Sequence, residues 1–298
     1  MAELQRVEEG VVVTRQSGFY TVWLTSGSLV EAVLRGKVRK AGPVLTGDRV
    51  RVRVGADGSA VVEEVLPRTT WLARPPVANV SCLVAVAAAP EPDLFLLDRL
   101  LVLGEASRLA CVVCINKIDL ATPEQVAQWR RLYEQAGYPV AATSGRTGDG
   151  VADLARLLVS HVSTLSGPSG VGKSSLINAL YPEARLEVGE LSPKLGRGRH
   201  TTRQVQLLPL PAGGLLADTP GFSRLELEGI APQQLDRLMP DIRRAAESCE
   251  FGDSCMHRGE EGCALPQAVE EGAVAASRFR HYRRLLEEVL EQEARKYS

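Results

Sequence analysis

The chain has 298 residues, of which 35 are basic and 36 are acidic, so its formal net charge is −1. At roughly 100–200 residues per domain, this length predicts two or three domains. The composition is 45% hydrophobic and 24% charged, which is that of an ordinary globular protein with enough material for a real core. The near-neutral total argues against a uniformly basic nucleic-acid-binding surface, although a sum can hide local stripes.

Neither a membrane segment nor a disulfide scaffold is expected. The longest apolar run, Val80–Pro90, falls well short of the ~20 residues that a bilayer span needs. The first six residues lack the apolar core of a signal peptide. Six cysteines are too few for a disulfide scaffold. We therefore expect a cytoplasmic protein whose thiols are reduced or metal-bound.

Residues 9–66 have the pattern of a small all-β domain. Short β-branched runs are separated by turn residues such as Gly18, Gly27 and Gly47. The predicted strands are 11–13, 20–24, 29–34, 50–54 and 60–65. Five short strands in about 60 residues favour a barrel, and the five-stranded OB-fold is the first candidate for a domain over residues 1–70. An SH3-like barrel fits almost as well.

From about residue 71, buried strands alternate with amphipathic helices. Core strands are predicted at Val80–Ala88, Cys111–Ile115, Val140–Thr143, Val162–Leu165, Val205–Leu210 and Leu215–Ala217. Helices are predicted near 94–109, 123–137, 150–160 and 173–180. This alternation predicts a parallel α/β sheet with flanking helices over residues 71–230. A third region, residues 231–298, combines a helical stretch, a Cys/His cluster and a charged helix from about 267.

A phosphate-binding loop follows the fourth predicted core strand. It matches GxxxxGK[ST] and consists of Gly167, Pro168, Ser169, Gly170, Val171, Gly172, Lys173 and Ser174, with Ser175 opening the helix-like stretch that follows. The glycines let consecutive backbone N–H groups turn toward phosphate oxygens, and the helix N-terminus adds a favourable field. Lys173 would reach the β- and γ-phosphates, and the Ser174 hydroxyl would bind Mg²⁺. The alternative is a glycine-rich turn that matches by accident.

A second motif predicts guanine recognition. Asn116, Lys117 and Asp119 form NKxD at the carboxyl end of a predicted strand, where α/β sheets bind ligands. The Asp119 carboxylate can accept hydrogen bonds from guanine N1–H and the 2-amino group, whereas adenine would present a lone pair. A polar helix cap is the alternative. Ser144 and Gly145, after the next strand, can place backbone N–H groups near guanine O6, and this favours guanine.

Two further loops have the character of GTPase switches. Asp218 ends a predicted strand and can hold Mg²⁺ through water, while the Gly221 N–H can contact the γ-phosphate. In the earlier segment GRHTT, a threonine could complete the Mg²⁺ shell. Either Thr201 or Thr202 can be that ligand. Five such signals in one sheet predict a GTP site.

The order of these motifs is informative. Ras-type GTPases begin with the phosphate loop, whereas here Asn116 precedes Gly167. All of these loops sit on one edge of the sheet, so the site survives if the chain is cut elsewhere and rejoined. The sequence resembles the circularly permuted GTPase family that acts in late maturation of the small ribosomal subunit in bacteria. The resemblance rests on the β-rich start, NKID, GPSGVGKSS, GRHTT, DTPGF and the C-terminal cluster.

The resemblance implies an N-terminal OB-fold, a central permuted P-loop GTPase domain and a C-terminal helical zinc-binding domain. It also implies GTP hydrolysis that is stimulated by the small ribosomal subunit. The position after the second switch motif, where Ras-type enzymes carry a water-positioning glutamine, holds Phe222. The family is similarly hydrophobic there and is thought to use a histidine of the first switch, which corresponds to His200. Hydrolysis by the chain alone is expected to be slow, because no arginine finger is evident.

Four potential metal ligands cluster near the C-terminus. They are Cys249, Cys255, His257 and Cys263. Three thiolates and one imidazole make a closed tetrahedral set, which suits a structural zinc ion rather than a catalytic one. The resembling family usually has four residues between the first two ligands; this chain has five, and the Gly252-Asp253 turn could absorb the extra one. The alternative is a loop with free thiols and a surface histidine.

Cys111 and Cys114 form a CxxC pattern of a different kind. They lie within a predicted strand, where residues three apart point to opposite faces. Redox pairs sit instead at a helix N-terminus, which lowers the thiol pKa. We expect these cysteines and Cys82 to be small buried hydrophobes.

The sequence therefore predicts a monomeric GTPase that binds the small ribosomal subunit and its rRNA, and couples hydrolysis to subunit maturation and its own release. One alternative is a GTP-gated RNA-binding module with little hydrolysis. Another is a GTPase that regulates a protein or membrane partner, although no amphipathic basic helix with bulky apolar anchors supports a membrane. Three acid-poor basic stripes, at 35–53, 194–203 and 278–284, are candidate RNA contacts or simply solvated charge.

Overall fold

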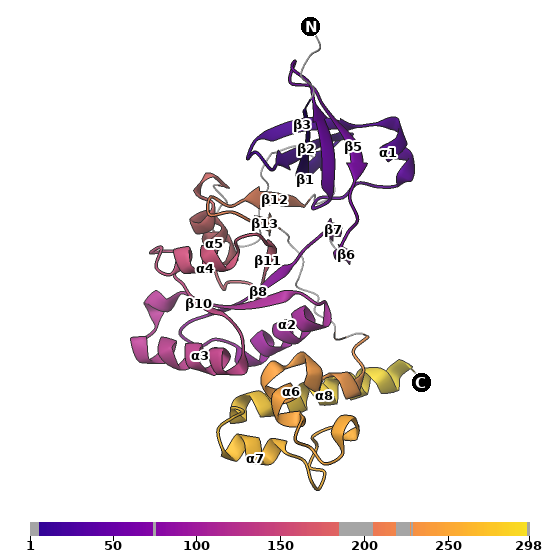
Figure 1. The fold of residues 1–298 in the computed structure, drawn as a ribbon. Coiled ribbons are helices and arrows are strands. Elements are labelled where there is room, and N and C mark those ends of the chain that lie inside the picture. Colours follow the sequence, from indigo (N-terminus) through magenta and orange to yellow (C-terminus); the bar gives the residue numbers. More distant parts are fainter. Residues whose placement is uncertain (1–5, 74–75, 185–204, 219–226, 228, 297–298) are drawn as a thin grey trace.

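The N-terminal region is a closed five-stranded barrel. In the computed structural model, which describes residues 6–73, 76–184, 205–218, 227 and 229–296, this barrel, a central sheet and a C-terminal helical region are stacked along the molecule (Figure 1). The barrel strands are β1 (Arg6–Gln16), β2 (Phe19–Leu24), β3 (Leu29–Leu34), β4 (Arg49–Val54) and β5 (Ala60–Val65). They are ordered β1-β2-β3-β5-β4 and β4 pairs back with β1. The prediction of an OB-fold is confirmed over the SH3-like alternative.

Alternation of buried and exposed residues along the strands fills the barrel. Val12, Val22, Val50, Val52 and Val62 point inward and are fully buried. A short helix, α1 (Gly36–Ala41), connects β3 to β4, and the sequence patterns did not predict it.

The barrel is joined to the rest of the chain through a small hairpin, β6 (Trp71–Ala73) and β7 (Pro76–Ala78), which was also not predicted. A Cβ at Gly47 would lie 2.0 Å from the Ala78 carbonyl oxygen, so this close approach requires glycine. Asn79 donates to the Gly47 carbonyl at 2.9 Å. Thr46 donates to the Val205 carbonyl at 3.3 Å, which connects the barrel to the segment that leads into β12.

The central sheet has six strands in the order β10-β9-β8-β11-β13-β12. Their bounds are β8 (Cys82–Ala88), β9 (Ala110–Asn116), β10 (Val140–Ala142), β11 (Val162–Ser166), β12 (Gln206–Pro209) and β13 (Leu215–Asp218). All pairs are parallel except β12–β13. The expectation of a parallel sheet is wrong for β12. The connection to β13 is a tight turn with Gly213 and Gly214 at positive φ, and a parallel pair needs a longer crossover.

Helices cover both faces of this sheet. The helices α2 (Leu94–Ala106) and α3 (Pro123–Ala136) pack on one face, where Leu97, Leu100 and Tyr133 are buried. The helices α4 (Val151–Leu157) and α5 (Lys173–Leu180) pack on the other, where Leu154 and Leu176 are buried. Single 3₁₀ turns occur at Ile118–Leu120 (η1) and Pro182–Ala184 (η2).

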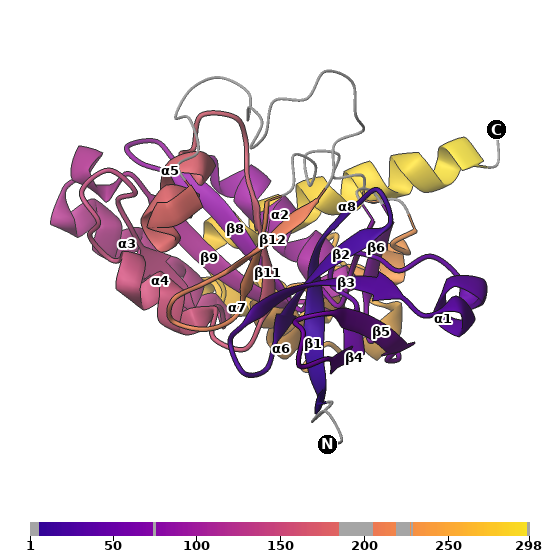
Figure 2. The same cartoon turned by 90° about the horizontal axis from the view of Figure 1, so that it is seen from above.

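The C-terminal region consists of several short helices and one long helix, α8, and it packs against α2 through α8 and η4. Its elements are η3 (Pro232–Gln234), η4 (Asp236–Leu238), α6 (Pro240–Ala246), η5 (Gly252–Ser254), α7 (Leu265–Glu270) and α8 (Ala276–Lys296). The helix predicted from about 267 is thus two helices. Figures 1 and 2 show α8 running beside α2, and Val102 of α2 belongs to the apolar core of this region. None of the helices in the described ranges has the length and apolar character that a bilayer crossing requires.

A buried ionic group lies at the junction between α2 and the C-terminal region. The Arg278 side chain of α8 is 1% exposed. It donates to Asp98 of α2 at 2.5 Å and, through two nitrogens, to Asp241 of α6 at 2.6 Å each. His281, one turn further along α8, contacts the other oxygen of Asp98 at 2.6 Å. We call Asp98, Asp241 and Arg278 the junction triad.

Candidate nucleotide site and metal centre

The predicted nucleotide motifs converge at one edge of the sheet. Asn116 ends β9, Ser144 follows β10, the phosphate loop follows β11 and Asp218 ends β13. Because these strands are parallel, their carboxyl ends meet on the same edge, which is where ligands bind in such sheets. Only the backbone of Asp218 is described, while His200, Thr201, Thr202 and Gly221 lie outside the described residues.

The phosphate loop has the local geometry that its sequence demands. Gly170 and Gly172 have φ of +83° and +91°, a region that other residues rarely adopt. Lys173, at the start of α5, donates to the carbonyls of Gly167 at 2.8 Å and Pro168 at 2.9 Å. Partial burial lowers the pKa of the Lys173 ammonium. The two hydrogen bonds hold the Lys173 side chain within the loop, where a phosphate would meet it.

Asn116 and Lys117 bind the phosphate loop rather than pointing away from it. Asn116 Nδ2 donates to the Val171 carbonyl at 2.8 Å, and its Oδ1 accepts from the Gly145 N–H at 3.1 Å. Lys117 Nζ donates to the Gly170 carbonyl at 2.6 Å. These bonds fasten three strand-end loops together. Two residues of the NKxD motif thus hold the phosphate loop in place.

The Asp119 carboxylate is held by the loop that follows β10. Ser144 Oγ donates to one of its oxygens at 2.6 Å, and Arg146 donates to the other at 2.7 and 3.1 Å. The hydrogen bond from Ser144, followed by that from Arg146, holds the pKa of Asp119 below its usual range, so it is ionised. The motif analysis did not select Arg146. The signal was a basic residue two positions after Ser144, since a guanidinium fork matches a carboxylate.

The cysteine and histidine cluster forms a compact ligand set. One ligand atom from each of Cys249, Cys255, His257 and Cys263 lies within 4.8 Å of the others. His257 Nδ1 is 3.3 Å from the Cys255 sulfur and 3.5 Å from each of the other two. Bonds of 2.1–2.3 Å at tetrahedral angles would separate N and S ligands by about 3.6 Å, so the set fits one tetrahedral ion.

The thiols of Cys255 and Cys263 need a bound cation to be deprotonated at neutral pH. Burial raises the pKa of Cys255 to about 12 and also raises that of Cys263, so without a metal both thiols are protonated at neutral pH. The Ala264 N–H donates to the Cys249 sulfur at 3.3 Å, a bond that favours a thiolate. The backbone turns into the site at Gly259 and Gly262, both with positive φ.

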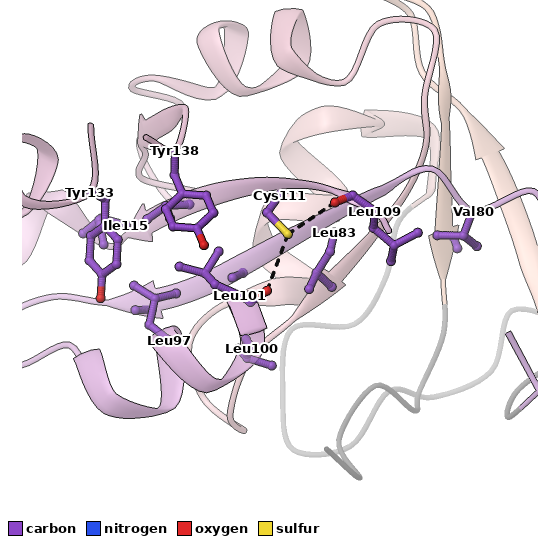
Figure 3. Packing of buried hydrophobic residues seen from close by; sticks show 14 of the residues in the cluster. Val80, Leu83, Leu97, Leu100, Leu101, Leu109, Cys111, Ile115, Tyr133 and Tyr138 are labelled. Atoms are coloured by element: carbon purple, nitrogen blue, oxygen red, sulfur yellow. Dashed lines mark hydrogen bonds between the residues drawn. The ribbon is translucent and has the colours of Figure 1, made fainter. Parts of the chain in front are cut away.

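Cys111 and Cys114 behave as the strand alternation predicts. Cys111 packs in the core beneath α2 and α3 (Figure 3). Cys114 packs in the core on the other face of the sheet. The carbonyl oxygens of Leu109 at 3.6 Å and Leu101 at 3.8 Å are the two acceptors within reach of the single Cys111 S–H. Burial raises the pKa of Cys114 to about 12 and that of Cys82 to about 11. These thiols are inert apolar fillers rather than a redox pair.

Two comparisons with protein families decide the identity. The RsgA GTPase family matches residues 65–228, and the RsgA N-terminal domain family matches residues 9–62. The chain belongs to the RsgA GTPase family. As a member, it is a GTP hydrolase whose nucleotide motifs occur in permuted order.

Individual relatives are similar to this chain over nearly its whole length. The small ribosomal subunit biogenesis GTPase RsgA of Moorella thermoacetica is 45% identical, covering 96% of this chain and 98% of its own. The Caldanaerobacter subterraneus protein of the same name is 42% identical, covering 99% and 100%. The crystal structure of YloQ, described as a circularly permuted GTPase, has a TM-score of 0.79 at 35% identity and covers 96% of each chain. YjeQ from Thermotoga maritima has a TM-score of 0.78 at 36% identity and covers 96% and 99%.

Proposed function

We propose that this GTPase binds the small ribosomal subunit and couples GTP hydrolysis to late maturation of the subunit and to its own release. The observation that supports it most is the combination, in one chain, of a permuted GTPase sheet with an OB barrel and a metal-binding helical region. Relatives that share this arrangement over their full length are named for small ribosomal subunit biogenesis.

Within the nucleotide site, we assign guanine recognition to the Asp119 carboxylate and support of the base to Ser144 and Gly145. The phosphates would lie against the backbone N–H groups of the phosphate loop and the Lys173 ammonium. Mg²⁺, which supplies charge neutralisation at the β- and γ-phosphates when bound, would be held by the Ser174 hydroxyl and by a threonine of the first switch, Thr202 or Thr201. Asp218 would hold the ion through water, and the Gly221 N–H would contact the γ-phosphate.

His200 is the proposed residue that orients the attacking water. The glutamine that does this in Ras-type enzymes is replaced by Phe222, whose side chain offers no hydrogen bond. The same replacement is why a GTP-gated RNA-binding module with little hydrolysis, even with small subunits present, is the competing function. Measured turnover separates the two.

At the metal centre, we assign zinc as the ion. A closed set of three thiolates and one imidazole suits structural zinc. Its function would be to fold the C-terminal region around the loop from Cys249 to Cys263.

For RNA, we assign the contact on the barrel to α1. Lys37, Arg39 and Lys40 are all exposed, and within the described part of the chain none of them is paired with a carboxylate. Three uncompensated cations on one short helix can each neutralise a phosphate.

The test is multiple-turnover GTP hydrolysis by the chain alone, with purified small subunits and, as a control, with large subunits. We expect slow hydrolysis that only small subunits accelerate. In His200→Ala, turnover with small subunits should fall by about 10²-fold or more while GTP affinity stays within a factor of about two, because the residue acts on water and not on the nucleotide. Unchanged turnover in this variant would reject the assignment of His200. The absence of stimulation by any subunit would reject the proposed function.

A further inference from the structure

The metal ligand His257 has a second nitrogen that the cluster does not use. Its Nδ1 faces the three cysteine sulfurs, so Nδ1 is the atom that would bind the ion. A neutral imidazole that binds a metal through one nitrogen carries a proton on the other. That proton is on Nε2, and His257 is 1% exposed, so water does not reach it freely. Nε2 therefore needs an acceptor inside the protein.

One carboxylate faces this nitrogen. Asp236 Oδ2 is 3.7 Å from His257 Nε2, and the Asp236 side chain is 16% exposed. Both His257 Nε2 and the other oxygen of Asp236, Oδ1, are buried without a hydrogen-bond partner among the described residues. A buried nitrogen without a partner is costly unless it reaches an acceptor, and the oxygen that faces His257 Nε2 is Oδ2 of Asp236. An approach of about 0.5–1 Å would make this contact a normal hydrogen bond.

The surroundings restrict the alternatives. The ring of Tyr282 packs beside His257 with the ring centroids 5.8 Å apart, and the Tyr282 hydroxyl donates to the Met256 carbonyl at 3.2 Å. Glu260, a carboxylate of the loop between Cys249 and Cys263, already accepts from the backbone N–H groups of Met256, Arg258 and Gly259. Asp236 is the carboxylate that the structure places opposite His257 Nε2.

We infer that Asp236 is a positioning residue of the metal centre: its carboxylate accepts a hydrogen bond from the Nε2–H of His257, fixing the tautomer and orientation in which Nδ1 binds the ion. Such an outer carboxylate also makes the imidazole a more basic ligand. Asp236 lies outside the Cys249–Cys263 loop, so a motif scan for ligands does not find it.

This assignment connects the metal centre to the rest of the molecule. Asp236 begins η4, whose neighbours Leu235 and Met239 are buried in the same apolar core as Val102 of α2. Binding of the ion would then also fix η4, the segment that runs between the GTPase sheet and α6. The metal loop and η4 would become ordered together.

The experiment compares Zn²⁺ affinity of the full chain and three variants by competition with a chelator. Asp236→Ala removes the acceptor, and Asp236→Asn keeps the shape and one acceptor oxygen but removes the charge. The matched control is Glu261→Gln, which removes the same charge at an exposed position two residues from Cys263. We expect Asp236→Ala to weaken Zn²⁺ binding about 10- to 100-fold, Asp236→Asn to weaken it less, and Glu261→Gln to change it less than about twofold.

A second readout separates positioning from a general loss of structure. In the Co²⁺-loaded protein, Asp236→Asn should shift the visible absorption bands, because the donor strength of His257 changes, while GTP affinity stays unchanged. Zn²⁺ affinities and Co²⁺ spectra of both Asp236 variants that match those of Glu261→Gln would overturn the inference. It rests on the metal centre proposed above, and the two fail differently: if the unmodified chain does not bind Zn²⁺, the metal assignment fails as well.

Discussion

Two arginine-rich regions that look alike in the sequence have opposite roles in the structure. On the barrel, Arg49, Arg51 and Arg53 are about half exposed and pair with glutamates of the neighbouring strands, at N–O distances of 3.2, 2.7 and 2.6 Å. On α8, Arg278 is buried and binds two aspartates from different elements. The barrel arginines form ion pairs on a solvent-exposed surface, whereas Arg278 joins the C-terminal region to α2.

This difference shows that a stretch of basic residues in the sequence does not always form a positively charged surface in the structure. Carboxylates distant in sequence decide what remains available, as Glu9 and Glu64 do for the barrel stripe and Asp98 does for Arg278. The expectation that the stripe at 278–284 contacts RNA is therefore wrong for Arg278. The stripe at 35–53 is neutralised along β4 and retains its unpaired cations on α1.

The largest effect is expected from Arg278→Ala. Removal of the guanidinium leaves the buried Asp241 carboxylate without its cation and Asp98 with His281 but no guanidinium, which should lower the free energy of unfolding by about 3–5 kcal/mol. Urea unfolding monitored by circular dichroism measures this change in the free energy of unfolding. Arg280→Ala, an exposed position on the same helix, is the control and should stay within about 0.5 kcal/mol.

A triple variant sharpens this result. If the loss comes from unpaired charge, then Asp98→Leu, Asp241→Leu and Arg278→Met combined should be at least as stable as Arg278→Ala alone. If the free energy of unfolding of the triple variant decreases by the sum of the decreases in the three single variants, then packing, and not ion pairing, stabilises the junction.

An intermediate effect is expected on RNA binding. Removing the α1 cations, as Lys37→Ala, Arg39→Ala and Lys40→Ala together, should weaken binding to small-subunit rRNA about tenfold at low salt and flatten the salt dependence, because up to three phosphate contacts are lost. Filter binding over a salt series measures both. The control removes three paired arginines instead, at Arg49, Arg51 and Arg53. Equal losses in both variants would break the distinction between paired and unpaired cations.

The smallest effect is expected from Arg51→Ala. Its ion pairs with Glu9 and Glu64 are exposed to solvent, and such pairs contribute about 0–1 kcal/mol to stability. Thermal unfolding at low and high salt measures the contribution, which should shrink as salt rises. A loss as large as that of Arg278→Ala would contradict the view that the barrel pairs only balance charge.

The sequence was sufficient for the architecture wherever a local pattern determines it. Strand alternation predicted the barrel and placed Cys111 and Cys114 on opposite faces of the sheet. Parallel strands put their carboxyl ends on one edge, so the convergence of Asn116 and the phosphate loop was predictable without coordinates. The antiparallel β12 was missed, although the turn glycines Gly213 and Gly214 indicate a tight connection.

Contacts between elements far apart in the chain were not predictable. His281 showed no partner in the sequence, yet it contacts Asp98 across 183 positions. The proposed pairing of Asp236 with His257 likewise corresponds to no sequence motif, because the two residues are 21 positions apart and nothing in the sequence links them. Such partners are set by how the helices pack, and packing depends on the whole apolar pattern rather than on any short segment.

The junction triad also constrains how this sequence can change over time. A substitution at any one of Asp98, Asp241 or Arg278 leaves charge buried without its counterpart, so single changes there should be eliminated while paired or triple exchanges survive. Descendants are expected to keep all three side chains or to replace them as a set, most readily with apolar residues. Covariation of these three positions among related sequences would then reveal the contact between α2 and α8 without any structure.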